Sequence, residues 1–107
     1  MVSATTLFNA MSDPTRLRLL ALLRQGERCV CDLVAALRVP QARASRHLAR
    51  LRAAGLVTSR RQGYWTYYAL APARGRVHRS LLTCLQACAR EEATLRADAR
   101  RCGGGRC

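Results

Sequence analysis

Two cysteines separated by a single valine are the residues of this 107-residue chain best suited to chemistry. Cys29 and Cys31 lie in "GERCVCDLVAAL", where apolar spacing predicts a short helix from about residue 30 to residue 37. The positive end of a helix lowers the pKa of a nearby thiol and favours the thiolate, the form that binds soft ions. The pair therefore predicts a thiophilic binding site, or alternatively two small buried side chains.

Helix geometry sets a condition on this site. Residues two apart on a helix point in nearly opposite directions, because each residue turns the chain by about 100°. Binding of one ion by both sulfurs is therefore expected to distort the first turn. We expect such a distortion to displace the helix that follows, because the two helices are expected to pack against each other.

Four further cysteines are candidates for additional ligands. Cys102 and Cys107 lie in "RRCGGGRC", a Gly-rich segment expected to form a flexible tail over residues 101–107. Either could supply a third thiolate, including from a second subunit. Cys84 and Cys88 are one helical turn apart and could either bind together or pack in an interface. The chain has no Cys-x-x-Cys and no βαβ pattern, which argues against a disulfide-exchange enzyme.

The charge points to a polyanionic partner. The net charge is +13, and all basic residues are arginine, which suits bidentate contacts with phosphate. No Asp or Glu occurs between Leu33 and Arg90, while arginines recur throughout that stretch. A long block of one sign is typical of nucleic-acid binding, although a merely solvated surface is the alternative.

The periodicity predicts a mainly α fold with one β-hairpin. Helices are expected at 5–10, from Pro14 to Gly26, at 30–37, at 40–55 and at 77–99, with a hairpin at 55–70. Two short helices with a tight turn, followed by a hairpin with the basic tip "RRQG", describe a winged helix-turn-helix of order α-α-α-α-β-β-α. Residues 1–100 are expected to form this DNA-binding and dimerisation domain.

The outer face of the helix at 40–55 is expected to read DNA. Its inward stripe is Ala44, Leu48 and Leu51, which leaves the polar residues to face the major groove. Arg60 and Arg61 at the hairpin tip are expected to meet phosphate or the minor groove. The aromatic residues of the second strand are expected to pack within the sheet. The predicted DNA-binding residues are Gln41, Arg43, Ser45, Arg46, Arg60 and Arg61.

The last helix predicts a homodimer. Its apolar stripe of Leu81, Leu82, Leu85 and Cys88 is expected to find no covering layer within so short a chain. It should pair with a second copy in a twofold dimer that binds an imperfect palindrome. The sequence contains no apolar run long enough for a membrane span and no secretory signal, so a cytoplasmic location with reduced thiols is expected.

Several segments together resemble the ArsR/SmtB family of bacterial metal-sensing repressors, over almost the whole chain. "SDPTRLRLLALL" resembles the family's second helix, and "ERCVCDLVAAL" resembles the metal-site helix of its arsenic-responsive branch. "QARASRHLARLRAAGLV" is similar to its recognition helix, with agreement at Gln41, Ser45, His47 and Leu48 and departures at Pro40 and Ala42, where serine is frequent. "RRQGYWTYYAL" resembles its wing.

The resemblance implies a homodimeric repressor, paired largely through its first and last helices, that leaves operator DNA when metal binds. Its arsenic branch implies As(III) or Sb(III) as inducer at Cys29 and Cys31, with no cofactor needed for DNA binding. Some arsenic sensors carry a third cysteine where this chain has Val34. The zinc-sensing branch uses a set of ligands on the last helix, of which this chain has only His78. Alternatives are a repressor sensing Cd(II), Pb(II), Cu(I) or thiol redox state, and a constitutive architectural nucleic-acid-binding protein.

Overall fold

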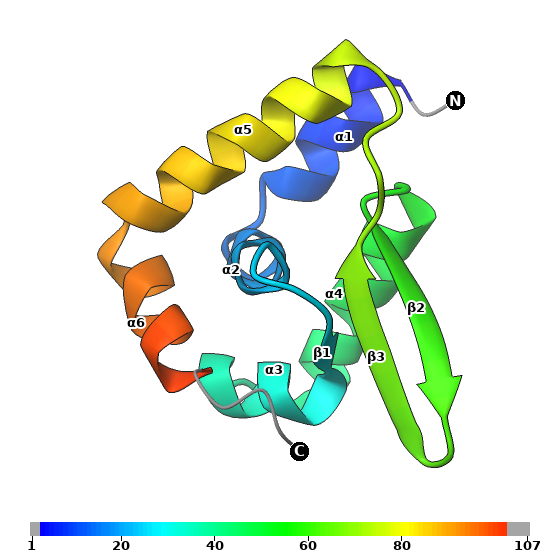
Figure 1. Cartoon of the computed structure of the whole chain (residues 1–107), viewed down its shortest axis with the longest axis vertical. Coiled ribbons are helices and arrows are strands. Elements are labelled where there is room, and N and C mark those ends of the chain that lie inside the picture. The colour runs from blue at the N-terminus through cyan, green and yellow to red at the C-terminus, as the bar shows by residue number, and fades with distance from the viewer. Residues whose placement is uncertain (1–2, 103–107) are drawn as a thin grey trace.

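A computed structural model describes residues 3–102 and shows nine elements around one core (Figure 1). The helices are α1 (Ala4–Met11), α2 (Pro14–Leu23), α3 (Val30–Leu37), α4 (Gln41–Ala53), α5 (Arg76–Glu91) and α6 (Ala93–Arg101). The strands are β1 (Arg28–Cys29), β2 (Val57–Gln62) and β3 (Trp65–Leu70). The mainly α winged helix-turn-helix predicted from the sequence is confirmed, with one additional strand and one additional helix.

Helix α2 is the centre of the fold. In Figure 1 it is seen end-on, with the other elements arranged around it. Most side chains in its second half are therefore buried, and Leu19, Leu20, Leu22 and Leu23 are almost fully inaccessible. The helix begins as predicted: Pro14 occupies the first helical position, and the Asp13 carboxylate accepts the Arg16 N–H at 3.0 Å.

Helices α3 and α4 form the predicted helix-turn-helix and pack against each other. Ala44, Leu48 and Leu51 are completely buried, which leaves the opposite face of α4 exposed. The turn between the helices is tight because Arg38 ends α3 in the left-handed region, at φ 58°. Pro40 then precedes α4 in an extended conformation, as expected for a residue at the start of a helix.

The wing is the hairpin of β2 and β3, which extends away from the helices (Figure 1). Gln62 pairs with Trp65, so Gly63 and Tyr64 form the tip, and Gly63 adopts a positive φ of 60°. Strand β1 adds a third strand to the sheet beside β3, pairing Cys29 with Tyr67. This two-residue strand was not predicted, because so short a segment has no detectable periodicity.

The predicted single helix over residues 77–99 is wrong. The chain bends at Glu92, where the backbone is extended, and α6 turns back to pack on α2 and α3. No glycine or proline marks the bend in the sequence. Tertiary contacts explain it instead: Leu95 and Asp98 of α6 are buried against the body of the protein. Arg101 and Cys102, assigned from the sequence to a tail, belong to α6 and its C-terminal cap.

The expectation that the apolar stripe of α5 lacks a covering layer is also wrong. Leu81 and Leu85 are buried in the core of the same chain, where α5 contacts α1 and α2. Leu82 and Cys88 are half-buried against that core. Large apolar side chains do remain exposed on these helices, with Phe8 of α1 58% and Val77 of α5 45% accessible. The homodimer stays a prediction.

Within residues 3–102, no helix is both long and apolar enough to span a lipid bilayer.

Candidate thiol site and nucleic-acid interface

Cys29 and Cys31 lie where β1 meets α3. Cys29 is the last residue of β1 and the N-cap of α3, with an extended backbone at φ −77° and ψ 153°. Its sulfur accepts the Cys31 N–H at 3.3 Å, in the position that a serine or aspartate oxygen occupies in an ordinary cap. Only Cys31 is inside the helix. Helical geometry therefore does not hold the two sulfurs apart in the way expected from the sequence.

The pair lies at the positive end of the α3 dipole, with Cys29 as the N-cap and Cys31 in the first turn. Asp32 follows in the same helical turn and is buried, and this burial raises its pKa while Arg28 lowers it. Asp32 was not predicted as part of the site, although an acidic residue in a first helical turn is a recognisable pattern.

A surface hollow of about 280 Å³ joins the thiol pair to both elements expected to bind DNA. On one side are Cys29, Val30 and Cys31, and on another are Gln41 and Ser45 of α4. The wing closes the hollow with Tyr64, Trp65, Thr66 and Tyr68. Two of the predicted DNA-binding residues and both predicted metal ligands thus line one space. The aromatic wall formed by Tyr64 and Trp65 was not foreseen, because only the tertiary fold brings the wing to the cysteines.

The candidate third ligands are differently placed. Cys102 is buried in the core at the end of α6. Among residues 3–102 no three His, Cys, Asp or Glu side chains are grouped closely enough to share a metal ion. Cys107 lies outside the described residues. On α5, Cys84 is exposed and hydrogen-bonded to Cys88, whose pKa is raised first by burial and then by Cys84. The third-ligand assignments therefore remain predictions.

The predicted base-reading residues share the open face of α4. Gln41, Arg43, Ser45 and Arg46 are all exposed. Their helix is held from behind by the buried stripe described above, so these side chains are presented on a rigid support. This arrangement is compatible with insertion of the first half of α4 into a major groove.

The two wing arginines differ. Arg60 donates to both carboxylate oxygens of Glu27, at 2.7 and 2.8 Å, and its guanidinium lies 4.6 Å from the centre of the Tyr67 ring. Arg61 points from the neighbouring register position and is exposed. The prediction that both arginines lie at the hairpin tip is wrong, because both lie within β2 and are paired with β3. Their predicted contacts with DNA stay a prediction, and Arg60 is hydrogen-bonded to Glu27 in the loop before Cys29.

His47 belongs to a polar cluster behind the reading face. Its Nδ1 lies 3.2 Å from Nη1 of Arg16 and 3.8 Å from the Asp13 carboxylate. Burial is the largest influence and lowers the pKa of His47; Asp13 raises it, and three nearby arginines lower it further. These contacts join α4 to the start of α2.

Sequence comparisons agree with this geometry. Residues 13–59 match the family described as "Bacterial regulatory protein, arsR family". An arsenic resistance transcriptional regulator of Pseudomonas putida, ArsR2, is 45% identical over 89 residues, which cover 81% of this chain and 77% of the relative. The chain belongs to the ArsR family. The arsenical resistance operon repressor of Escherichia coli is 51% identical over 67 residues, covering 62% of this chain and 57% of that repressor.

The fold is shared with solved transcriptional regulators, among them one described as a possible ArsR-family regulator. The homodimeric winged helix-turn-helix domain of Mb0332 from Mycobacterium bovis superposes with a TM-score of 0.66 at 34% identity. The match covers 81% of this chain and 78% of that domain. These relatives are transcriptional regulators, so family membership identifies this protein as a regulator rather than an enzyme.

Proposed function

We propose that this ArsR-family regulator represses transcription by binding operator DNA as a homodimer, and that it leaves the operator when As(III) or Sb(III) binds Cys29 and Cys31. The observation that carries the proposal is the shared hollow, in which both cysteines lie beside Gln41 and Ser45 of the recognition helix. The names of the Pseudomonas and E. coli relatives support arsenic as the signal. The proposed site of action is the cytoplasm, where thiols are kept reduced.

DNA binding rests on α4 and the wing. Gln41, Arg43, Ser45 and Arg46 contact base edges in the major groove, with arginine preferring guanine and glutamine preferring adenine. Arg60 and Arg61 contact the backbone or the minor groove from the wing. DNA binding needs no cofactor, since these contacts come from the chain's own side chains. In a homodimer the two recognition helices read the two halves of an imperfect palindrome.

Inducer binding rests on soft donors. Trivalent arsenic and antimony prefer thiolate sulfur, and the N-terminal end of a helix is in general a favourable place for thiolates. The donor set therefore fits the proposed inducer. A third thiolate from Cys102 or Cys107, of the same or the partner subunit, completes the site in this proposal. Cys102 must leave the core to take part.

The cap of α3 supplies the switch. The Cys29 sulfur accepts a hydrogen bond from the Cys31 N–H. When this sulfur binds a metalloid, it donates electron density to the new bond and becomes a weaker hydrogen-bond acceptor. The first turn of α3 then loses its cap, and the hollow between α3, α4 and the wing changes shape. Because α3 packs on α4, the protein with inducer bound presents Gln41 and Ser45 in an altered position. Inducer and operator thus favour different conformations of α3.

The test is operator release, measured by fluorescence anisotropy under reducing conditions. The Cys29→Ser, Cys31→Ser double variant should bind the operator normally but fail to release it with arsenite. Cys84→Ser is the matched control, because it removes an exposed thiol far from the hollow and should release DNA like the parent. A double variant that still releases DNA on arsenite addition would refute the assignment.

The same assay separates the alternatives. Release by Cd(II), Pb(II) or Cu(I) but not by arsenite would identify a different soft inducer, and release by oxidant alone would identify a redox sensor. Binding that no metal or oxidant reverses would identify a constitutive DNA-binding protein. Single replacement of Cys102 and Cys107 by serine then assigns the third ligand, because only the true ligand lowers arsenite affinity while leaving DNA binding intact.

A further inference from the structure

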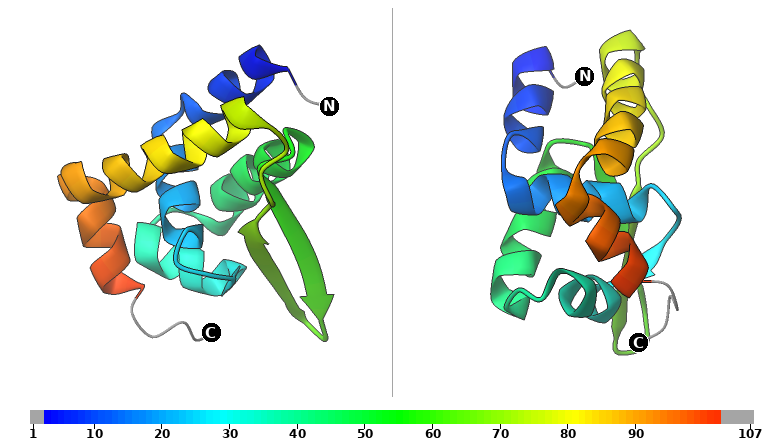
Figure 2. Two further views of the ribbon diagram at one scale, coloured as in Figure 1. Left: turned by 45° about the horizontal axis from the view of Figure 1, so that its top comes forward. Right: turned by 90° about the vertical axis from the view of Figure 1, so that its left-hand side faces the viewer.

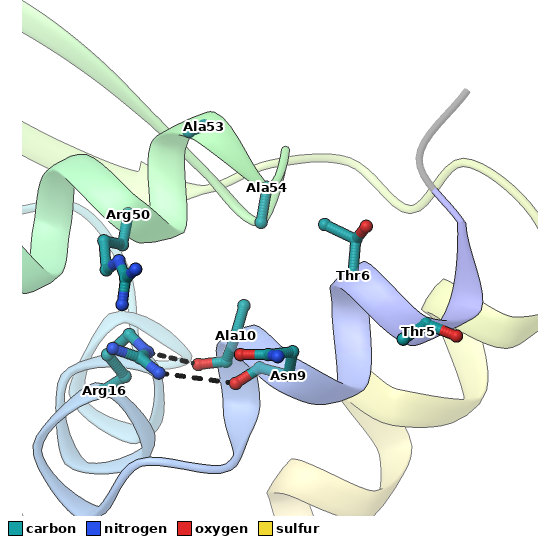
Figure 3. A pocket seen from close by; sticks show the side chains of 8 residues that line it. All are labelled: Thr5, Thr6, Asn9, Ala10, Arg16, Arg50, Ala53 and Ala54. Atoms are coloured by element: carbon teal, nitrogen blue, oxygen red, sulfur yellow. Dashed lines mark hydrogen bonds between the residues drawn. The ribbon is translucent and has the colours of Figure 1, made fainter.

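A cleft between α1 and the end of α4 lies outside the reading surface described above. It has a volume of about 340 Å³ and is lined by Thr5, Thr6, Asn9, Ala10, Arg16, Arg50, Ala53 and Ala54. Three alanines on its walls leave the space open (Figure 3). No acidic residue lines it.

Two guanidinium groups face each other across this cleft (Figure 3). Arg16 is buried and held rigidly: its Nε donates to the Ala10 carbonyl at 2.7 Å and its Nη2 to the Asn9 carbonyl at 3.3 Å. Arg50 reaches toward it from α4 and is exposed. Within residues 3–102, no hydrogen bond or ion pair engages the Arg50 side chain. Asp13 lies near Arg16 but does not line the cleft, so the exposed guanidinium of Arg50 has no carboxylate on the cleft walls and is a suitable partner for an anion.

The position of the cleft identifies the anion. Arg50 follows Arg46 by one helical turn, so the cleft continues the exposed arginine stripe of α4 beyond its base-reading half. Helices α1 and α4 lie along the same edge of the molecule in the right-hand view of Figure 2. DNA seated on the open face of α4 therefore brings its sugar-phosphate backbone to the mouth of this cleft.

We propose that the Arg16–Arg50 cleft binds a phosphodiester group of the operator backbone. Arg50 supplies the direct contact, and buried Arg16 supplies a fixed positive potential behind it. Asn9 provides an amide donor on the opposite wall. Such a contact positions the recognition helix without reading sequence. The inference rests on the proposed DNA binding but assigns a site separate from the predicted base contacts.

The test is the salt dependence of DNA binding. Arg50→Ala should weaken binding to operator and to unrelated DNA by a similar factor, roughly ten-fold at moderate salt. The slope of log affinity against log salt should become less steep by about 0.9 for each phosphate that the variant no longer neutralises. Arg52→Ala is the matched control: it removes the same charge from the same helix but lies outside the cleft. It should leave the slope at the parental value.

A second variant tests directly whether the positive charge of the cleft contributes to DNA binding. Asn9→Asp places a carboxylate on the wall of the cleft that Arg50 also lines, so the positive charge of the cleft is partly neutralised and DNA affinity should fall without loss of helical signal in circular dichroism. If Arg50→Ala and Asn9→Asp both bind DNA like the parent, or if Arg52→Ala lowers the slope as much as Arg50→Ala, the inference is wrong.

Two further outcomes distinguish a failure of the proposed phosphate site from a failure of the proposed function. A parent that binds DNA with a steep salt slope while Arg50→Ala is unchanged overturns this site and leaves the proposed function standing. A parent that binds no operator overturns both. A further measurement asks whether the cleft binds DNA phosphate or free phosphate. The melting temperatures of the DNA-free proteins are compared in potassium phosphate and in potassium chloride of equal ionic strength. Stabilisation of the parent alone by phosphate, with unchanged DNA binding by Arg50→Ala, would assign the cleft to a free anion instead.

Discussion

Glu27 accepts hydrogen bonds from Nε and Nη2 of Arg60 at 2.7 and 2.8 Å, and so joins the loop before Cys29 to the DNA-binding wing. The hydrogen bonds from Arg60 hold the pKa of Glu27 below its usual value. Both side chains are exposed, and the arginine also lies over the Tyr67 ring. If Arg60 binds phosphate as proposed, these N–H groups must first leave Glu27.

Removing this carboxylate should strengthen DNA binding. In Glu27→Gln, Arg60 loses its ionic partner, so it becomes available to DNA and the salt slope should steepen by about 0.9 for each additional phosphate that it neutralises. Filter binding or anisotropy at several salt concentrations measures the change. Glu91→Gln on α5 is the control, because it alters the net charge equally at an exposed position away from the wing. Equal increases in affinity in both variants would show a general charge effect rather than release of Arg60.

Trp65 should report inducer binding. It is the only tryptophan of the chain and lines the same hollow as Cys29 and Cys31. Arsenite added to the parent should change its fluorescence emission, because a charged or polar group then enters the space beside the half-exposed indole. The double cysteine-to-serine variant should show no change at the same arsenite concentration. A parental signal that persists in that variant would place the binding event elsewhere.

Asp98 should be the most important charged residue for stability. Its side chain is 1% exposed, and it binds Arg18 at 2.8 Å and Arg101 at 2.6 Å, which attaches α6 to α2. These arginines also donate to the carbonyls of Leu37 and Ala36 at the end of α3. Asp98→Ala should therefore lower the free energy of unfolding by about 3 kcal/mol, since it leaves cations without their partner.

Urea denaturation measures the effect of Asp98→Ala, with Glu91→Ala as an exposed acidic control. The control should stay within about 0.5 kcal/mol of the parent. If Asp98→Ala unfolds at the parental urea midpoint, the packing of α6 owes nothing to this charge cluster.

Stability should fall as the pH falls through the titration range of histidine. Burial lowers the pKa of His78, with Arg74 lowering it further, and burial is also the main cause of the lowered pKa of His47. Both folded pKa values lie below the unfolded value of 6.5, so the unfolded chain binds more protons in this range. The free energy of unfolding should therefore decrease between about pH 7.5 and pH 5.5, by at most about 1.4 kcal/mol per pH unit for each histidine.

Replacement of His78 by asparagine removes one of these two titrating side chains and so measures its share of the pH dependence. Thermal or urea unfolding of His78→Asn should show a shallower decrease with falling pH than the parent, whatever its stability at neutral pH. A parallel pair of curves would mean that His78 has the same proton affinity in the folded and unfolded chains.

Local patterns in the sequence determined the helix-turn-helix and the wing. The spacing of Ala44, Leu48 and Leu51 was enough to place α4 and its exposed face, because a 3.6-residue period depends only on neighbours along the chain. The bounds of α3 were predicted for the same reason, with Cys29 as the boundary residue. The hairpin was predicted from the alternation on both sides of "RRQG", but its tip lies at Gly63 and Tyr64 rather than over residues 60–63.

Contacts between distant residues were decided by the tertiary structure alone. The chain bends at Glu92, and α6 then packs where Asp98 binds Arg18, which is eighty residues away in the sequence. No local sequence pattern predicts a contact over so long a separation. The same holds for the hollow: it forms only when β1, α3, α4 and the wing meet, so the sequence identified Cys29 and Gln41 but not their shared space. Periodicity describes which face of an element is buried, whereas a site between elements depends on how those faces pack.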